Sequence, residues 1–524
     1  MDGRNLIGFK LSGIAQKIMQ SFDAATLEIL DGVFHVASEA EIDEAMQKAT
    51  EAFQTYKNTS GKDKAKFLNA IADEILALDN TLVERAMLES GLPEGRIKGE
   101  RGRTVNQLRL FAKVLEEGSW VEAFIDRGDP TRTPQPKPDI RKMLMPIGPV
   151  VVFTASNFPL AFSTAGGDTA AALAAGNPVV IKAHEAHLGT NTLVALAIQK
   201  AAQKTGMPNG VFSSLNGTGP ELGQHLAQHP LCKAIAFTGS YRAGKALFDT
   251  CAKRAVPIPV FAEMGSINPV VLLKEKLANE ATELAKQIAH SITLGVGQFC
   301  TNPGLLIAQQ GPELAAFKKA LSAAIKQIPP GTMLNANVCE NYKTSRAKTL
   351  AVASVQLEAE TEHTVETTSG SATVASVTAK DFMANPALMD EVFGPFSLIV
   401  SCENADEIQS VVEGLEGQLT ATIMGTSTEL STQEKLISTL QDKVGRLIFN
   451  NVPTGVEVCH AMHHGGPFPA TTDSRYTSVG TGAIRRFARP IAFQNWPTAL
   501  LSPALKDENL LGIWRTIDGE LTKG

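Results

Sequence analysis

The alternation of short apolar runs with helical stretches between residues 149 and 261 limits the fold of this 524-residue chain more than any other feature. One intervening stretch, Gly189 to Lys204, has apolar residues at helical spacing and stops before Gly206 and Pro208. Strands and helices that alternate at this spacing form βαβ units, so the sequence predicts a parallel sheet that binds ligands at the carboxyl ends of its strands. The predicted strands are Pro149–Phe153, Pro178–Ile181, Val211–Leu215, Ala234–Phe237 and Pro259–Phe261.

A second alternation runs from about residue 268 to residue 450, and residues 32 to 120 have mostly helical periodicity. Residues 354 to 378 are rich in Ser, Thr and Glu, so we expect weak surface strands or a loop there. A chain of this length exceeds a single hydrophobic core, which predicts two or three α/β domains. The strands predicted in this part are Val270–Leu273, Leu305–Ala308, Phe396–Val400 and Arg446–Phe449.

The segment from Asp126 to Arg141 breaks both patterns because it contains several prolines and no periodic apolar residues. Such chain forms either an arm that leaves the body and packs on a neighbouring subunit, or a disordered loop. The sequence leaves both possibilities open.

Composition excludes several classes of protein. The net charge of −6 gives no basic surface for nucleic acid. The six cysteines are scattered without a C-x-x-C pair, so we expect no disulfide framework, no structural metal site and a reducing cytoplasm. The N-terminus lacks the order of a signal peptide. The most apolar stretch, Met143 to Phe162, contains three prolines, so we expect no membrane span.

The stretch from Gly295 to Pro303 carries the candidate nucleophile. Gly295 and Gly297 end a helical pattern, which leaves Cys300 on a loop where its amide is free to face a substrate. Taken alone, such a cysteine is more often a small buried hydrophobe. However, a carboxylate at Glu263 and a carboxamide at Asn157 complete the groups that acyl-thioester chemistry requires.

Five motifs in order make the chain resemble the aldehyde dehydrogenase superfamily from about Gly32 to Trp496. The resemblance implies an α/β fold with a Rossmann-type cofactor domain, an α/β catalytic domain and a small β oligomerisation arm. The expected division is 1–126 and 146–262 for the dinucleotide-binding domain, 263–450 for the catalytic domain, 127–145 and 483–524 for the arm and tail, and 451–482 for a return segment lining the active site. The motifs are Asn157-Phe158-Pro159, Phe237-Thr238-Gly239-Ser240, Glu263-x-Gly265-x-x-Asn268-Pro269, Gly297-Gln298-x-Cys300 and Glu391-x-Phe393-Gly394-Pro395.

The mechanism that these residues support is covalent oxidation of an aldehyde to an acid. Cys300 attacks the aldehyde carbon, and the Asn157 amide and the Cys300 backbone N–H stabilise the alkoxide. Hydride passes to a nicotinamide, and Glu263 activates the water that hydrolyses the thioester. Two alternatives are a catalytically silent scaffold relative and an acylating enzyme that transfers the thioester to coenzyme A; the Glu at position 263 favours water.

The cofactor is expected to be NAD, with NADP possible. Gly239, Ser240 and Gly244 follow a strand and begin a helix, where backbone amides can hold a phosphate. By the resemblance, Lys182 bonds a ribose hydroxyl, and a carboxylate at Glu185 would repel a 2′-phosphate, although Lys182, His184 and His187 could offset this repulsion. The resemblance also implies that Glu391 holds the nicotinamide ribose and that Phe393 packs on the ring.

Substrate residues follow from the same resemblance. Phe158 is expected beside the substrate tunnel, which Ala165 makes roomier because several relatives have Trp there. Arg101, Arg103 and Gln107 lie on a helix that is apolar at the tunnel mouth of relatives; an arginine there can grip a distal carboxylate, or it can be part of a solvated helix start.

The segment from Val452 to Pro467 resembles the branch that contains 2-oxoglutarate semialdehyde (2,5-dioxopentanoate) dehydrogenases and certain bacterial long-chain aldehyde dehydrogenases. His460 in this segment could reach the thiol and tune it, although such a histidine is more often a packed loop residue. We therefore expect 2-oxoglutarate semialdehyde as the substrate, with a long-chain fatty aldehyde as the alternative. The expected assembly is a homodimer or homotetramer.

Overall fold

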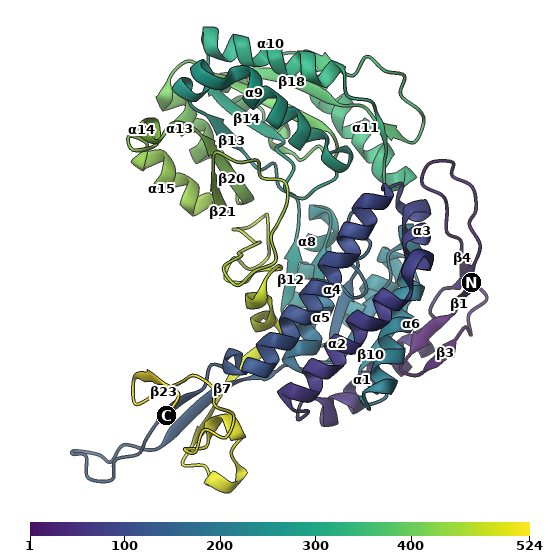
Figure 1. The fold of residues 1–524 in the computed structure, drawn as a ribbon, viewed down its shortest axis with the longest axis vertical. Helices are drawn as coiled ribbons and strands as arrows, with labels where there is room; N and C mark the ends of the chain where they lie inside the picture. The colour runs from purple at the N-terminus through teal and green to yellow at the C-terminus, as the bar shows by residue number, and fades with distance from the viewer.

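The computed structural model describes residues 1–524 as two α/β lobes and a projecting β arm (Figure 1). The first lobe is built on a seven-stranded sheet in which five adjacent strands, starting from one edge, are parallel, as predicted. In sheet order its strands are β12 (Val260–Glu263), β11 (Ala234–Thr238), β8 (Val150–Phe153), β9 (Val179–Lys182), β10 (Phe212–Leu215), β2 (Asn5–Ile7) and β3 (Lys10–Ser12).

Alternation of side chains along these strands explains why they have continuous apolar sequences. In β8, Val150 and Val152 pack into one core, whereas Val151 and Phe153 pack into another on the opposite face. Helices cover both faces, so both sets of side chains are buried. The first face is covered by α2 (Gly61–Ala77), α4 (Glu94–Glu117), α5 (Gly167–Ala175) and α6 (Leu188–Lys204), and the second by α1 (Glu39–Tyr56), α7 (Gln224–Gln228) and α8 (Tyr241–Ala252).

The second lobe contains another seven-stranded sheet, in which only β16 runs antiparallel to its neighbour. Its helices α9 (Lys274–Thr293) and α10 (Pro312–Lys326) pack on one face, and α11 (Ala336–Leu350) and α13 (Ala405–Gly414) on the other. In sheet order the strands are β16 (Gln356–Glu360), β18 (Thr373–Thr378), β19 (Phe396–Cys402), β14 (Leu305–Gln309), β13 (Val270–Leu272), β20 (Gln418–Met424) and β21 (Val444–Phe449).

The expectation of weak surface strands or a loop at residues 354 to 378 is wrong for β18. This strand lies inside the sheet, between β16 and β19, and its first five residues are buried. Its polar side chains are hydrogen-bonded: Arg346 Nε donates to Thr373 Oγ1 at 2.8 Å, and Ser376 bonds the Glu358 carboxylate. A satisfied hydroxyl can occupy a buried strand, which composition alone does not reveal.

The proline-containing segment forms the projecting hairpin of a five-stranded arm (Figure 1). The hairpin connects β6 (Phe124–Asp126) to β7 (Ile140–Pro146), and Asp129 and Lys137 pair within its loop. The arm strands, in order, are β22 (Ala488–Gln494), β7, β6, β23 (Arg515–Ile517) and β24 (Glu520–Thr522).

A return segment after β21 brings the chain back to the first sheet. The Met264 backbone N–H donates to Ala470 O at 2.8 Å, and Glu263 forms an antiparallel bridge with Thr471. The segment around residues 464 to 478 therefore lies against the carboxyl end of β12.

No helix combines the length and the hydropathy that crossing a bilayer requires.

Candidate active site

The loop that carries Cys300 has an unusual backbone. After α9 ends, Gly295, Val296 and Gly297 all have positive φ, at 56°, 57° and 65°. A β-branched residue such as Val296 is strained in this conformation, and strain of this kind persists only where the surroundings impose it. A Cβ at Gly297 would lie 2.3 Å from the Gly394 carbonyl, so glycine lets this loop touch the Glu391–Pro395 segment.

A buried asparagine, Asn268, holds the Cys300 loop by hydrogen bonds to its backbone. Asn268 Nδ2 donates to Cys300 O at 2.8 Å and to Asn302 O at 2.9 Å. Asn268 itself has φ of 44° and accepts from Thr420 Oγ1 at 3.0 Å. The position of the Cys300 backbone is thus set by residues of the second lobe.

The Cys300 thiol faces two buried acid–base side chains. His464 Nε2 lies 3.4 Å from Cys300 Sγ and 2.9 Å from Glu263 Oε1. Ser478 Oγ donates to the other Glu263 oxygen at 2.6 Å. Cys300, Glu263 and His464 come from three distant segments, and their ligand atoms all lie within 4.8 Å of one another.

One ring nitrogen of His464 serves both contacts, because Nδ1 is buried without a partner. An ionised carboxylate only accepts hydrogen bonds, so the arrangement assigns the hydrogen to Nε2, which donates to Glu263 and also lies toward the sulfur. Burial raises the pKa of the Glu263 carboxyl, but His464, Ser478 and Cys300 outweigh it and leave the pKa below its ordinary value. Burial, followed by the charge of Glu263, holds the pKa of the Cys300 thiol well above its usual range. The resting pair is therefore a thiol beside a carboxylate.

Asn157 lies beside the same loop, just past the carboxyl end of β8. Its Nδ2 donates to Gln298 O at 3.2 Å, two residues before the cysteine. The Asn157 backbone is held by its neighbours, since the N–H groups of Leu160 and Ala161 donate to Glu100 Oε1 at 2.8 and 2.9 Å. The carboxamide donor and the Cys300 loop are in direct contact.

A pocket of about 560 Å³ connects this site to the predicted cofactor residues. Lys182 and Glu185 form an ion pair of 3.0 Å at one end, and Glu185 Oε1 accepts from the Gly219 N–H at 2.8 Å. Burial lowers the pKa of Lys182. A pocket of this size, with a charged end and a helix start, fits a dinucleotide. Its walls include Asn157, Lys182, His184, Glu185, Gly239, Ser240, Glu263, Cys300, Glu391 and Phe393.

Gly244 does not line this pocket but allows close packing beside it. A Cβ at Gly244 would lie 2.7 Å from the Met264 side chain, so glycine brings the first turn of α8 against β12. Ser240 caps the same helix, with its Oγ accepting from the Ala243 N–H at 3.4 Å.

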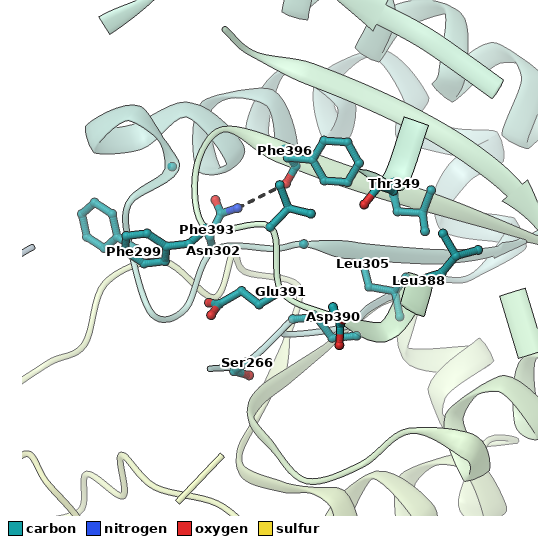
Figure 2. Close-up of a pocket in the computed structure, with 15 residues that line it drawn as sticks. Ser266, Phe299, Asn302, Leu305, Thr349, Leu388, Asp390, Glu391, Phe393 and Phe396 are labelled. Atoms are coloured by element: carbon teal, nitrogen blue, oxygen red, sulfur yellow. Dashed lines mark hydrogen bonds between the residues drawn. The ribbon is translucent and has the colours of Figure 1, made fainter. Parts of the chain in front are cut away.

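The Glu391–Pro395 segment lies behind the cysteine loop (Figure 2). Asn302 Nδ2 donates to Phe396 O at 3.3 Å, and the Glu391 side chain lies between Phe299 and Ser266 (Figure 2). Burial raises the pKa of Glu391 to about 8. Glu391 and Phe393 line both this space and the larger pocket, so they can contact a cofactor that extends toward Cys300.

On the other side of Asn157, arginines of α4 lie over a cluster of phenylalanines. Arg96 lies 4.4 Å from the Phe158 ring and pairs with Glu100 at 3.5 Å. Arg103 lies 5.8 Å from the Phe158 ring and 5.4 Å from the Phe162 ring. Arg103 Nε and Nη2 are buried without hydrogen-bond partners. Burial lowers the pKa of Arg103, and the negative charge of Glu100 opposes this effect.

The other predicted substrate residues lie in packed surroundings. Gln107 is buried and its Nε2 would be 2.7 Å from a Cβ at Gly167, so it packs on the start of α5. Ala165 is buried within the first-lobe core. Arg101 donates to Asp79 O at 3.0 Å at the surface.

The prediction for His460 is wrong, because the histidine at the thiol is His464. His460 is exposed and its Nδ1 lies 3.2 Å from Thr481 Oγ1. Sequence reasoning also missed Ser478 and the anchoring role of Asn268. The His463-His464 pair before Gly465-Gly466 was a sequence signal for a histidine near the thiol. The geometry of the loop, however, decides which histidine of the segment turns inward.

Comparisons with known proteins identify the family of the chain. A model of the aldehyde dehydrogenase family matches residues 13–468. The chain is 48% identical over 521 residues to alpha-ketoglutaric semialdehyde dehydrogenase 2 of Azospirillum brasilense, with 99% of both chains covered. It is 42% identical over 523 residues to alpha-ketoglutaric semialdehyde dehydrogenase of Acinetobacter baylyi, covering 100% of this chain and 99% of the relative.

Solved structures share the fold. A Thermus 1-pyrroline-5-carboxylate dehydrogenase with bound NAD superposes with a TM-score of 0.78 at 21% identity, over 94% of this chain and 92% of the other. At this sequence identity the structural similarity shows that the fold is shared, but it gives no information on the substrate.

Proposed function

Because the chain belongs to the aldehyde dehydrogenase family, we propose that it oxidises 2-oxoglutarate semialdehyde to 2-oxoglutarate through a thioester on Cys300. The broader activity is that of an NAD(P)-dependent aldehyde dehydrogenase. The observation that carries the substrate proposal is Arg103, whose two buried, unpartnered nitrogens adjoin the aromatic cluster beside Asn157. Alpha-ketoglutaric semialdehyde, another name for the same compound, is the substrate in the names of the two relatives.

The first step is attack by Cys300 on the aldehyde carbon. Glu263 takes the thiol proton, because its ionised carboxylate lies beside the sulfur. The His464 Nε2–H then stabilises negative charge on the sulfur or on the carboxylate, whichever carries it. The alkoxide that forms accepts hydrogen bonds from Asn157 Nδ2, which turns from the Gln298 carbonyl, and from the Cys300 backbone N–H.

A bound nicotinamide dinucleotide supplies the hydride acceptor for the collapse to a thioester. Glu263 releases the first proton to water in the pocket that it and Cys300 both line. It then takes a proton from the water that attacks the thioester, and the Cys300 thiolate leaves. Glu263 then returns the proton that it took from water to the Cys300 thiolate. The products are the carboxylate, the reduced nucleotide and two protons, one released by Glu263 and one by the new carboxylic acid.

The distal carboxylate distinguishes the two substrate candidates. A 2-oxo acid places a carboxylate where Arg103 can bind it with two parallel hydrogen bonds, whereas a fatty aldehyde would leave this buried cation unpaired. The decisive experiment compares kcat/KM for 2-oxoglutarate semialdehyde, glutarate semialdehyde and pentanal, which have the same chain length, together with a long-chain aldehyde. A preference for pentanal or the long-chain aldehyde over both acids would reject the proposal.

For the nucleotide, the supporting observation is the carboxylate of Glu185 at the charged end of the pocket. The ion pair of Glu185 with Lys182 has a net charge of zero. A 2′-phosphate at this end of the pocket would therefore gain no free cation from the pair. We therefore favour NAD, and a higher kcat/KM with NADP would contradict this choice.

The arm suggests self-association into a homodimer or homotetramer. Its strands β22 and β24 have free edges, and β21 is a free edge of the second-lobe sheet. Exposed apolar side chains of the arm and tail include Trp496, Leu500, Leu510, Leu511, Trp514 and Leu521. Light scattering after gel filtration tests the assembly.

All six cysteines are unpaired, which supports a cytoplasmic location.

A further inference from the structure

We propose that Zn²⁺ inhibits this enzyme by binding Cys300 Sγ, His464 Nε2 and a Glu263 carboxylate oxygen together. The three donor atoms lie within 4.8 Å of one another, with 3.4 Å between sulfur and nitrogen and 2.9 Å between nitrogen and oxygen. A thiolate, an imidazole and a carboxylate are the three ligand types that zinc prefers in proteins.

The spacing is close to that of a zinc site. Tetrahedral zinc with bonds of about 2.3 Å to sulfur and about 2.0 Å to nitrogen and oxygen separates sulfur from nitrogen by about 3.5 Å and nitrogen from oxygen by about 3.3 Å. These two observed distances need to change by only a few tenths of an ångström, and the sulfur–oxygen separation lies within 4.8 Å. The ion would take the place of the His464 Nε2 hydrogen and the Cys300 thiol hydrogen between these three groups.

The charge balance also favours the divalent ion. When Zn²⁺ binds, the Cys300 thiol gives its proton to solvent, Glu263 binds as a carboxylate, and the hydrogen of His464 moves to Nδ1, which has no partner to lose. Two anions and one neutral ligand then neutralise the metal in a buried setting. Cys300 and Glu263 line the large pocket, which leaves a fourth position open to water.

Selectivity among metals follows from the ligand set. Mg²⁺ and Ca²⁺ prefer several oxygen ligands, and this site offers one. Zn²⁺, and Co²⁺ as its spectroscopic substitute, suit the sulfur and nitrogen donors. The ion is an inhibitor of the site and not a participant in the reaction, since it occupies the thiol, the base and the stabilising imidazole at once.

The test combines a binding signal with inhibition. Addition of Co²⁺ to the purified full-length enzyme should produce the intense near-ultraviolet absorption of a cobalt–thiolate bond, with a stoichiometry of one ion, and Zn²⁺ should displace it. Zn²⁺ should suppress aldehyde oxidation reversibly on addition of EDTA, whereas equal Mg²⁺ should not. The absorption needs no turnover, so it remains informative even if the proposed function fails; the inhibition readout alone rests on that function.

Variants locate the site. Cys300→Ser should abolish the thiolate band, and His464→Ala should weaken zinc binding at least tenfold. His463→Ala and Cys459→Ser are matched controls, because they remove a neighbouring histidine and the other partly exposed cysteine. Both controls should retain the cobalt band. A band that survives Cys300→Ser, a band that Cys459→Ser removes, or the absence of any thiolate band would overturn the proposal.

Discussion

Replacement of Arg103 by Met tests how the enzyme recognises the acid group of its substrate. Methionine keeps most of the apolar volume over Phe158 and Phe162 but removes the buried Nε and Nη2 donors. A hydrogen bond to a charged group contributes about 1.5–3 kcal/mol, so loss of a two-point contact should cost about 3 kcal/mol in transition-state stabilisation. This corresponds to a decrease of roughly a hundredfold in kcat/KM.

Steady-state NADH formation with 2-oxoglutarate semialdehyde and with pentanal measures this effect. The decrease should occur with the acid substrate, mostly through KM, while kcat/KM for pentanal stays within about twofold. Arg109→Met on the same helix is the control, because Arg109 is exposed and pairs with Asp73 at 3.0 Å. Equal losses for both aldehydes, or no loss for the acid, would refute the role of Arg103 in carboxylate binding.

Two other substitutions test separate parts of the account. His464→Ala should lower kcat roughly 10- to 100-fold and slow alkylation of Cys300 by iodoacetamide, because one charge-assisted donor is lost. The control His463→Ala should change neither rate. An unchanged alkylation rate in His464→Ala would exclude His464 from stabilising the thiolate. Lys64→Met should raise the melting temperature near pH 7. Lys64 is buried, and burial lowers its pKa from 10.5 to about 8. Between about pH 8 and pH 10.5 the unfolded chain binds more protons at this lysine than the folded chain, so wild-type stability rises relative to the variant with pH; a constant difference in melting temperature across this window would contradict that assignment.

The first-lobe sheet was predictable because its strands bury both faces, which produces apolar runs that periodicity detects. The same logic failed for β18, whose Thr373 and Ser376 are buried but hydrogen-bonded, so their composition resembles that of a surface. The N-terminal strands β2 and β3 were missed for a different reason. Each has three residues, and β2 is defined by its pairing with β10 more than 200 positions away.

The predicted nucleophile, base and carboxamide are brought to one place by the fold, since the parallel strands β8 and β12 end at the same edge of the sheet. The histidine was misassigned because His460 and His464 lie in one loop, and only the return of residues 464 to 478 onto β12 decides which of them is buried. Residues directly after a strand or a terminated helix, such as Asn157 and Cys300, could be placed from sequence pattern, whereas residues of the long return segment could not.

The most direct test of the account is the intact mass of the Glu263→Gln enzyme, quenched after mixing with NAD and 2-oxoglutarate semialdehyde. The amide cannot activate water, and it also slows deprotonation of the Cys300 thiol. Over a long incubation the account therefore predicts slow formation of up to one equivalent of NADH and a mass increase of one acyl group, which peptide mapping should locate on Cys300. Sustained turnover with an unmodified cysteine, or an acyl group on another residue, would contradict the claim that Cys300 carries the thioester and Glu263 promotes its hydrolysis.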